Sequence, residues 1–339
     1  MAGTSPRLFS RFLLRTAPSR DRLARRLERA LSKLGLVPAQ QPSPDLLTAR
    51  QCHRSWHIPN TVNINPAPIY QVPTDAEFLT GYGVFLDELD RLYASDHGSF
   101  VVRVNDGEFH FLRGSDTGNA VPGRRHFRQL LPESTRMEFR SALEKAHLVG
   151  VNMNWSWRDD FITQEGLRGR VIPAEYIYAG LASGHLIRKY PSLGIIGAEE
   201  KIDLIRRLLG WQEFREYVGL HESVEMIGIP QKFAGNATEE IAQYLISKVS
   251  ESDRRLFIFG MGIAKLGIAE RLARETGRFF LDVGIGVDAL AGIVDPYRPY
   301  MGAWKNFQLL ASDAYADVDF CQVGTFGNRV ILAGEPPQV

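Results

Sequence analysis

The chain has 339 residues, of which 44% are hydrophobic and 23% are charged, and its formal net charge is +1. These are the proportions of an ordinary globular protein, and the balanced charge excludes a protein that binds polyanions through its overall charge, so no nucleic-acid partner is expected. Cys52 and Cys321 form no CxxC pair, so neither a zinc site nor a disulfide framework is expected, and a reducing cytoplasm fits best.

The first 36 residues predict a basic amphipathic helix. Arginine and lysine far outnumber acidic residues there, and an apolar stripe at helical spacing is formed by Leu23, Leu27, Leu31 and Leu34. Such a helix can lie on an anionic membrane surface, which would place the protein peripherally on the inner face of the membrane. An organellar transit peptide has a similar composition. A solvated tail, or a helix packed on the domain, remains a third interpretation.

Residues 37–73 are rich in Pro, Asn and Gln and show no sustained period, which predicts an irregular linker. His53 and His57 are four residues apart, as two metal ligands on a helix would be, but Pro59 makes a helix there doubtful. Two ordinary polar loop residues are therefore the favoured interpretation. Residues 74–339 are expected to form an α/β domain.

This domain shows alternating helical and strand patterns. A helix is predicted from Thr74 to about Tyr93, followed by a buried strand at Ser99–Val104. Further strands are predicted at His147–Val151, Leu193–Gly197, Val224–Ile229, Leu256–Gly260, Phe279–Val283 and Val330–Ala333, and helices at Glu199–Leu209, Thr238–Val249 and Ala264–Thr276, the last closed by Gly277. Apolar strands alternating with helices predict a Rossmann-like, mostly parallel sheet with helices on both faces. Ligands of such sheets bind at the carboxyl ends of strands, near a topological switch point.

The first strand is followed by Asp106-Gly107-Glu108. Two carboxylates separated by a glycine suit a hard divalent cation that also binds substrate phosphates. Arg103 could bind a phosphate, and Asn105 and Gly107 are expected beside the same ligand. The alternative is an Asp-Gly turn that joins two strands, with Phe109–Leu112 as the second strand.

Two later segments also carry candidate binding residues. Gly260-Met261-Gly262 joins a strand to a helix that carries Lys265, an arrangement that can receive an anion, although a plain tight turn would look the same. The segment Asp282-Val283-Gly284-Ile285-Gly286 superficially matches the Asp-x-Gly-x-Gly loop of S-adenosylmethionine methyltransferases. In those enzymes the loop follows the first strand of the domain, whereas here it comes late in the chain.

The segment from Asn152 to Asp160 combines amides, two tryptophans, an arginine and two carboxylates, as a site for a sugar or base would. Asp160, or its neighbour Asp159, could act as a general base towards an acceptor hydroxyl. The alternative is a surface loop that its two tryptophans anchor to the core.

In the order of these motifs the chain resembles the GT-D glycosyltransferases, a Rossmann-like family once labelled as a domain of unknown function. The resemblance runs from about Ser99 to Asp288, and its strongest parts are the strand with Asp106-Gly107-Glu108 and the unit from Phe257 to Asp288. It implies a nucleotide-diphosphate sugar as donor and a divalent metal, Mn²⁺ or Mg²⁺, on Asp106 and Glu108. Family members often have His directly after Asp-Ile-Gly, where this chain has Ile285.

The resemblance and the motifs together predict a metal-dependent glycosyltransferase, with a UDP-sugar as the favoured donor and a glycan or another hydroxyl compound as acceptor. Asp106, Glu108 and Asp160 are the expected catalytic residues. Arg103, Asn105, Gly107, Gly260, Gly262, Lys265 and Asp282 are expected to bind the donor. A non-catalytic nucleotide-binding scaffold of the same fold and an S-adenosylmethionine-dependent methyltransferase are the two alternatives.

Overall fold

The computed structural model describes residues 75–113, 133–152, 158–182, 184–190, 192–220, 224–229, 238–292, 315 and 317–318. The predicted basic helix at 1–36, the linker at 37–73 and the predicted strand at 330–333 lie outside the described residues. Within the described part, no helix combines the length and the apolar character that crossing a membrane requires.

The centre of the molecule is a seven-stranded sheet in the order β3-β2-β1-β7-β6-β4-β5, and every neighbouring pair is parallel. The strands are β1 (Ser99–Val104), β2 (Leu148–Val151), β3 (Val171–Pro173), β4 (Leu193–Ala198), β5 (Glu225–Ile229), β6 (Leu256–Phe259) and β7 (Phe279–Asp282). The prediction of a mostly parallel sheet is confirmed, as are the predicted strands within the described part. β3 was not predicted, because three residues are too few to show a period.

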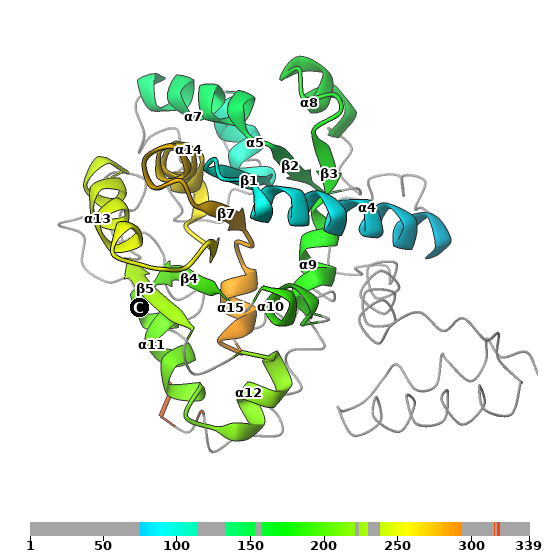
Figure 1. Cartoon of the computed structure of the whole chain (residues 1–339). Coiled ribbons are helices and arrows are strands. Elements are labelled where there is room, and N and C mark those ends of the chain that lie inside the picture. The colour runs from blue at the N-terminus through cyan, green and yellow to red at the C-terminus, as the bar shows by residue number, and fades with distance from the viewer. Residues whose placement is uncertain are drawn as a thin grey trace, which may run out of the picture.

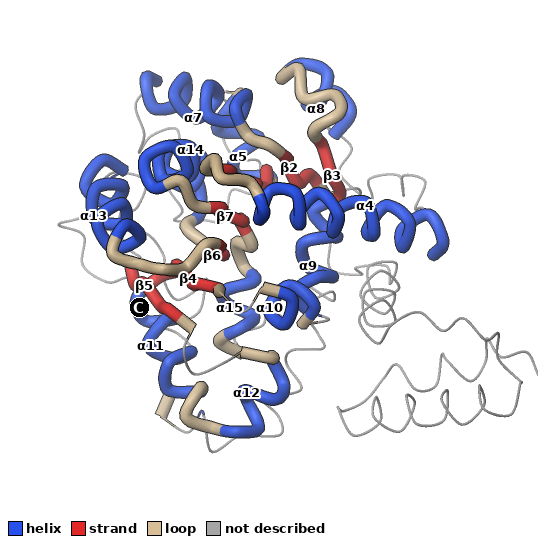
Figure 2. Tube along the Cα trace, viewed as in Figure 1, coloured by secondary structure: helices blue, strands red, loops and turns tan. Residues whose placement is uncertain are grey.

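Helices cover both faces of the sheet, as predicted (Figures 1 and 2). One face packs against α5 (Asp106–Leu112), α7 (Glu133–Lys145), α8 (Arg158–Gln164), α13 (Thr238–Ser250) and α14 (Lys265–Thr276). The other packs against α4 (Asp75–Ala94), α9 (Ala174–Ala182), α10 (His185–Lys189), α11 (Glu199–Leu208), α12 (Gln212–Val218) and α15 (Gly286–Leu290). Side chains of β1 alternate between the two cores: Val102 and Val104 belong to the first and Val101 to the second.

Local signals explain where two helices begin and end. As predicted, α14 closes on Gly277, whose φ of 66° suits a residue without a Cβ. At the start of α5, the Glu108 carboxylate accepts the backbone N–H of Asn105 at 2.9 Å, which is half of a capping box. The alternative of a hairpin with a strand at Phe109–Leu112 is therefore wrong, because this segment is helical.

The topology changes direction between β1 and β7, which are neighbours in the sheet. The chain leaves β1 into α5 on one face of the sheet and leaves β7 into α15 on the opposite face. This is a topological switch point, the usual ligand-binding position of an open parallel sheet. We call the carboxyl ends of β1 and β7, with residues 103–108 and 282–286, the switch-point site.

Candidate functional site

The switch-point site brings together two motifs that lie far apart in the sequence, Asp106-Gly107-Glu108 and Asp282-Val283-Gly284. Because β1 pairs with β7 in parallel, with Val101 opposite Leu281, the first motif, just after β1, and the second, which begins with the last residue of β7, lie at the same edge of the sheet. The backbone N–H of Arg103 donates to Oδ2 of Asp282 at 2.8 Å, so the two strand ends are joined directly.

Asp282 is the centre of this junction and has no exposed surface. Its Oδ2 accepts the N–H of Arg103 and lies 2.9 Å from Nζ of Lys265. Its Oδ1 accepts the backbone N–H of Gly284 at 2.8 Å. Both oxygens are therefore engaged by the protein itself, and the side chain fixes the turn that follows β7.

Lys265 connects this aspartate to the first motif. It is the first residue of α14 and only 1% exposed, and its Nζ lies 2.8 Å from Oε1 of Glu108 as well as close to Asp282. Buried charges persist in proteins when they are paired. We call Arg103, Glu108, Lys265 and Asp282 the buried charge cluster; its two positive and two negative groups tie β1, α5, α14 and β7 together.

Arg103 completes the cluster with a looser contact. One guanidinium nitrogen lies 3.6 Å from Oδ1 of Asp282, beyond hydrogen-bond distance, and the guanidinium stands 4.8 Å from the ring centre of Tyr178 on α9. Within the described residues, its Nε and Nη1 have no hydrogen-bond partner. A Cβ added to Gly284 would lie 1.6 Å from the guanidinium, so this glycine is needed for the arginine to fit.

The remaining predicted binding residues frame the cluster. Asn105 is the N-cap residue of α5, Asp106 is its first residue and Gly107 is in its first turn. A Cβ on Gly260 would lie 2.4 Å from the carbonyl oxygen of Gly284, so the turn after β6 packs directly on the turn after β7. Gly262 is exposed and has a φ of 57°.

Asp160 lies in the first turn of α8, the helix that follows β2, and its side chain is exposed. The next residue, Phe161, packs edge-to-face on Phe109 of α5 with ring centres 5.8 Å apart, so α8 stands beside α5. Residues 153–157 of the predicted sugar-handling segment lie outside the described residues.

One of the two expected metal ligands, Glu108, is already engaged by the protein, and the side chain of the other, Asp106, lies outside what the structure describes. Both oxygens of Glu108 are engaged, one with Lys265 and the other with the N–H of Asn105. A cation bound to Glu108 would stand against the lysine ammonium, so Glu108 does not fit a metal ligand in this arrangement. Among the described residues there is no group of three or more His, Cys, Asp or Glu that could hold a metal ion.

Sequence reasoning missed two parts of this edge of the sheet. Tyr178, which faces Arg103, lies in a helix that the sequence analysis did not predict. Lys201 of α11 and Asp288 of α15 form a second buried ion pair near the same strand ends. Neither has a local sequence signal, because both contacts join segments that only the sheet order brings together.

The fold and the site define an α/β protein with a parallel sheet and a polar junction at its switch point. No family model matches the chain, and no curated protein matches it. The chain is similar to a solved structure described as "the highly conserved domain of unknown function 1792", which "has a distinct glycosyltransferase fold". The two share 19% identity at a TM-score of 0.40, over 63% of this chain and 83% of the other.

A selenomethionine-substituted structure of the same domain is 18% identical, with a TM-score of 0.35, over 55% of this chain and 72% of the other. Likenesses this remote carry no argument about activity.

Proposed function

We propose that this chain is a glycosyltransferase that moves a sugar from a nucleotide-diphosphate sugar, with a UDP-sugar favoured, to a hydroxyl group of a glycan or another acceptor. The observation that supports the proposal is the meeting of Asp106-Gly107-Glu108 with Asp282-Val283-Gly284 at the switch point of a parallel sheet. This edge is where open α/β sheets bind nucleotides.

In this proposal Asp106 is the protein ligand of a divalent cation, Mn²⁺ or Mg²⁺. Magnesium commonly binds one or two carboxylates, several waters and the phosphates of its substrate, so a single aspartate at the start of α5 is sufficient. The cation would neutralise charge that develops on the departing diphosphate. Glu108 has a different role here: through Asn105 and Lys265 it holds the first turn of α5 in place.

The buried charge cluster has a supporting role at the proposed donor site. Arg103 and Lys265 are each 1% exposed, so we assign them the task of fixing the strand ends rather than contacting the donor. In the turn after β6, Gly262 is exposed and a Cβ added to it would meet nothing within 4 Å, so its backbone is open to an approaching ligand, whereas Gly260 packs on Gly284. Asp160, exposed on the helix beside α5, is the proposed base that takes the proton from the acceptor hydroxyl.

Ligand-induced stabilisation tests the substrate class. The proposal expects UDP with Mn²⁺ to raise the melting temperature and S-adenosylmethionine to leave it unchanged; a ligand at one hundred times its Kd adds about 2.7 kcal/mol. Stabilisation by S-adenosylmethionine alone would identify a methyltransferase. Binding of UDP without donor turnover would identify a non-catalytic scaffold.

Donor hydrolysis and transfer, assayed with and without Mn²⁺, test the chemistry. Asp106→Asn is expected to lower turnover on the order of 100-fold or more, the loss that follows removal of one group that stabilises the transition state. The matched control is Asp253→Asn, because Asp253 is 85% exposed in the loop before β6, at the opposite edge of the sheet. Turnover that is indifferent both to metal and to Asp106→Asn contradicts the mechanism.

A further inference from the structure

A second buried ion pair lies on the other side of the turn that follows β7. Lys201 is in the first turn of α11, which follows β4, and pairs with Asp288 of α15. The two residues are 8% and 7% exposed. The proposed reaction assigns neither residue a part.

The two buried lysines hold the same turn from opposite faces of the sheet. Lys265 begins the helix after β6 and binds Asp282 at the start of the turn, on the face covered by α5 and α14. Lys201 lies near the start of the helix after β4 and binds Asp288 just beyond the turn, on the face covered by α11 and α15. Residues 283–286 are thus anchored at both ends.

Close contacts of glycines leave this turn and the start of α15 little freedom to shift. A Cβ on Gly197 would lie 2.8 Å from Cγ1 of Val287, and one on Gly286 would lie 2.6 Å from Cδ1 of Leu181. Gly260 meets the carbonyl of Gly284 in the same way. Glycines on β4, after β6 and in the turn itself therefore let the turn and the start of α15 pack closely on three neighbours.

Stability alone does not account for the Lys201–Asp288 pair. Two charges lose their hydration on burial, and well-packed apolar residues of similar volume are often as stabilising as a buried ion pair. In some proteins a buried polar or ionic group also selects one arrangement over close alternatives. Here the arrangement concerns a turn at the switch-point site, where small displacements of binding groups affect a ligand strongly.

We propose that Lys201 and Asp288 are positioning residues that fix the turn at residues 283–286 for donor binding. This inference rests on the proposed function, because the donor is what the turn would help to bind. The pair acts through the placement of α15 relative to α11, and neither side chain needs to touch the donor.

Hydrogen–deuterium exchange tests the positioning role without an activity assay. In Lys201→Met/Asp288→Leu both charges are removed together, so no unpaired buried charge remains and the protein is expected to fold. Amides of residues 283–290 should exchange faster than in the wild type, while those of α13 and α14 should not change. The matched control is Lys248→Met/Glu251→Leu, an exposed pair at the end of α13.

Binding of UDP with Mn²⁺, and the KM for a UDP-sugar, test the consequence for the donor. The double variant should bind UDP on the order of tenfold more weakly, with kcat little changed, since only the placement of a binding element is altered. Lys201→Arg, which keeps the charge, should retain most of the affinity.

Unchanged exchange at residues 283–290 overturns the inference. If the amides exchange faster but the double variant binds UDP as tightly as the wild type, the inference is also overturned, because holding the turn would then not contribute to donor binding. If the wild-type protein does not bind UDP, the proposed function fails and the donor role fails with it. The exchange measurement still decides whether the pair holds the turn.

Discussion

At the scale of single residues, Gly284 is the position of the switch-point site where an added side chain would be most disruptive. Its φ is 48°, which disfavours any side chain, and a Cβ would collide with the guanidinium of Arg103. Gly284→Ala should therefore combine backbone strain with displacement of a buried arginine. We expect it to lower the free energy of unfolding by about 2–5 kcal/mol, measured by urea denaturation.

Gly277→Ala is the control for this prediction. Gly277 has a φ of 66°, similar to that of Gly284, but an added Cβ would meet nothing within 4 Å. It should therefore show backbone strain alone, about 1–2 kcal/mol. Equal effects of the two substitutions would mean that Arg103 moves aside at no cost and does not constrain the turn.

The sequence identified the residues of the switch-point site better than their roles. Asp106-Gly107-Glu108 and Asp282 stood out as polar groups at the ends of apolar strands. That Glu108 and Asp282 both bind Lys265 could not be read from the sequence, because the contact depends on β7 lying beside β1. Arg103 was predicted as a phosphate ligand, and nothing in the sequence indicates that Tyr178 and Gly284 enclose its guanidinium.

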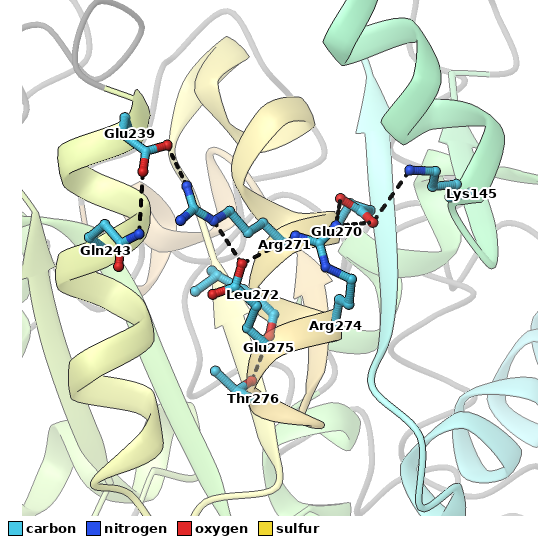
Figure 3. A network of polar contacts seen from close by, with 9 residues as sticks. All are labelled: Lys145, Glu239, Gln243, Glu270, Arg271, Leu272, Arg274, Glu275 and Thr276. Carbon is cyan, nitrogen blue, oxygen red and sulfur yellow. Dashed lines mark hydrogen bonds and ion pairs between the residues drawn. The ribbon is translucent and has the colours of Figure 1, made fainter.

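At the scale of elements, α14 is held by charges on two sides. Its first residue, Lys265, is buried against Glu108 and Asp282. Its outer surface carries a network in which Arg271 reaches Glu239 on α13, and Glu270 reaches Lys145 on α7 (Figure 3). Arg271 lowers the pKa of the Glu239 carboxyl through a hydrogen bond, yet water screens such exposed pairs.

Removing one positive charge from α14 should have very different effects at Lys265 and at Arg271. Lys265→Met leaves two carboxylates without their shared buried partner and should lower the free energy of unfolding by about 3–5 kcal/mol. Arg271→Met should have little effect, and that effect should shrink further in high salt. Urea denaturation at low and high salt measures both. A mild effect of Lys265→Met would mean that the carboxylates are hydrated and the cluster is open to water.

The elements themselves were predicted where their patterns were long. β1 and β4 stood out as continuous apolar runs, and the helices α11, α13 and α14 showed apolar residues at helical spacing. The α5 segment was ambiguous because Asp106-Gly107 is typical of a hairpin turn. The spacing of Asn105 and Glu108, a capping-box pattern, was the signal that favours the helix actually formed.

At the scale of the whole molecule, the order of the strands in the sheet could not be predicted from the sequence. Parallel strands need not pair in chain order, and here β6 and β7 return to lie between β4 and β1. Right-handed crossovers restrict the possible orders without selecting one. The choice follows from how the two cores pack, which involves side chains from most elements at once. For this reason the sequence predicts that a switch point exists, but not which strands form it.

Global stability should also depend on pH through His147, at the amino edge of the sheet. Its Nδ1 accepts the N–H of Phe100, which links the start of β2 to β1. Burial lowers the pKa of His147, the positive charge of Arg91 acts in the same direction, and Glu88 and Arg170 also influence it, with opposite signs. The unfolded chain, with a histidine pKa of about 6.5, therefore binds a proton more readily than the folded protein.

The sign follows from proton linkage. Where the unfolded state binds more protons, stability falls as the pH is lowered, by at most about 1.4 kcal/mol per pH unit for one group. The loss begins near the unfolded pKa of about 6.5 and is complete below the lower folded pKa. Glu88 titrates in a separate window: its hydrogen bond with Arg91 lowers its pKa below the ordinary 4.5, so its contribution persists until more acidic pH.

His147→Asn isolates this contribution, because the asparagine Oδ1 can accept the N–H of Phe100 but does not titrate. Urea denaturation of both proteins at pH 7.5 and 5.5 should show that the wild type loses more stability than the variant over this interval. The comparison cancels the other histidines, which the two proteins share. Parallel losses in the two proteins would mean that His147 accepts its proton without disturbing the β1–β2 junction, and that its burial does not oppose charging.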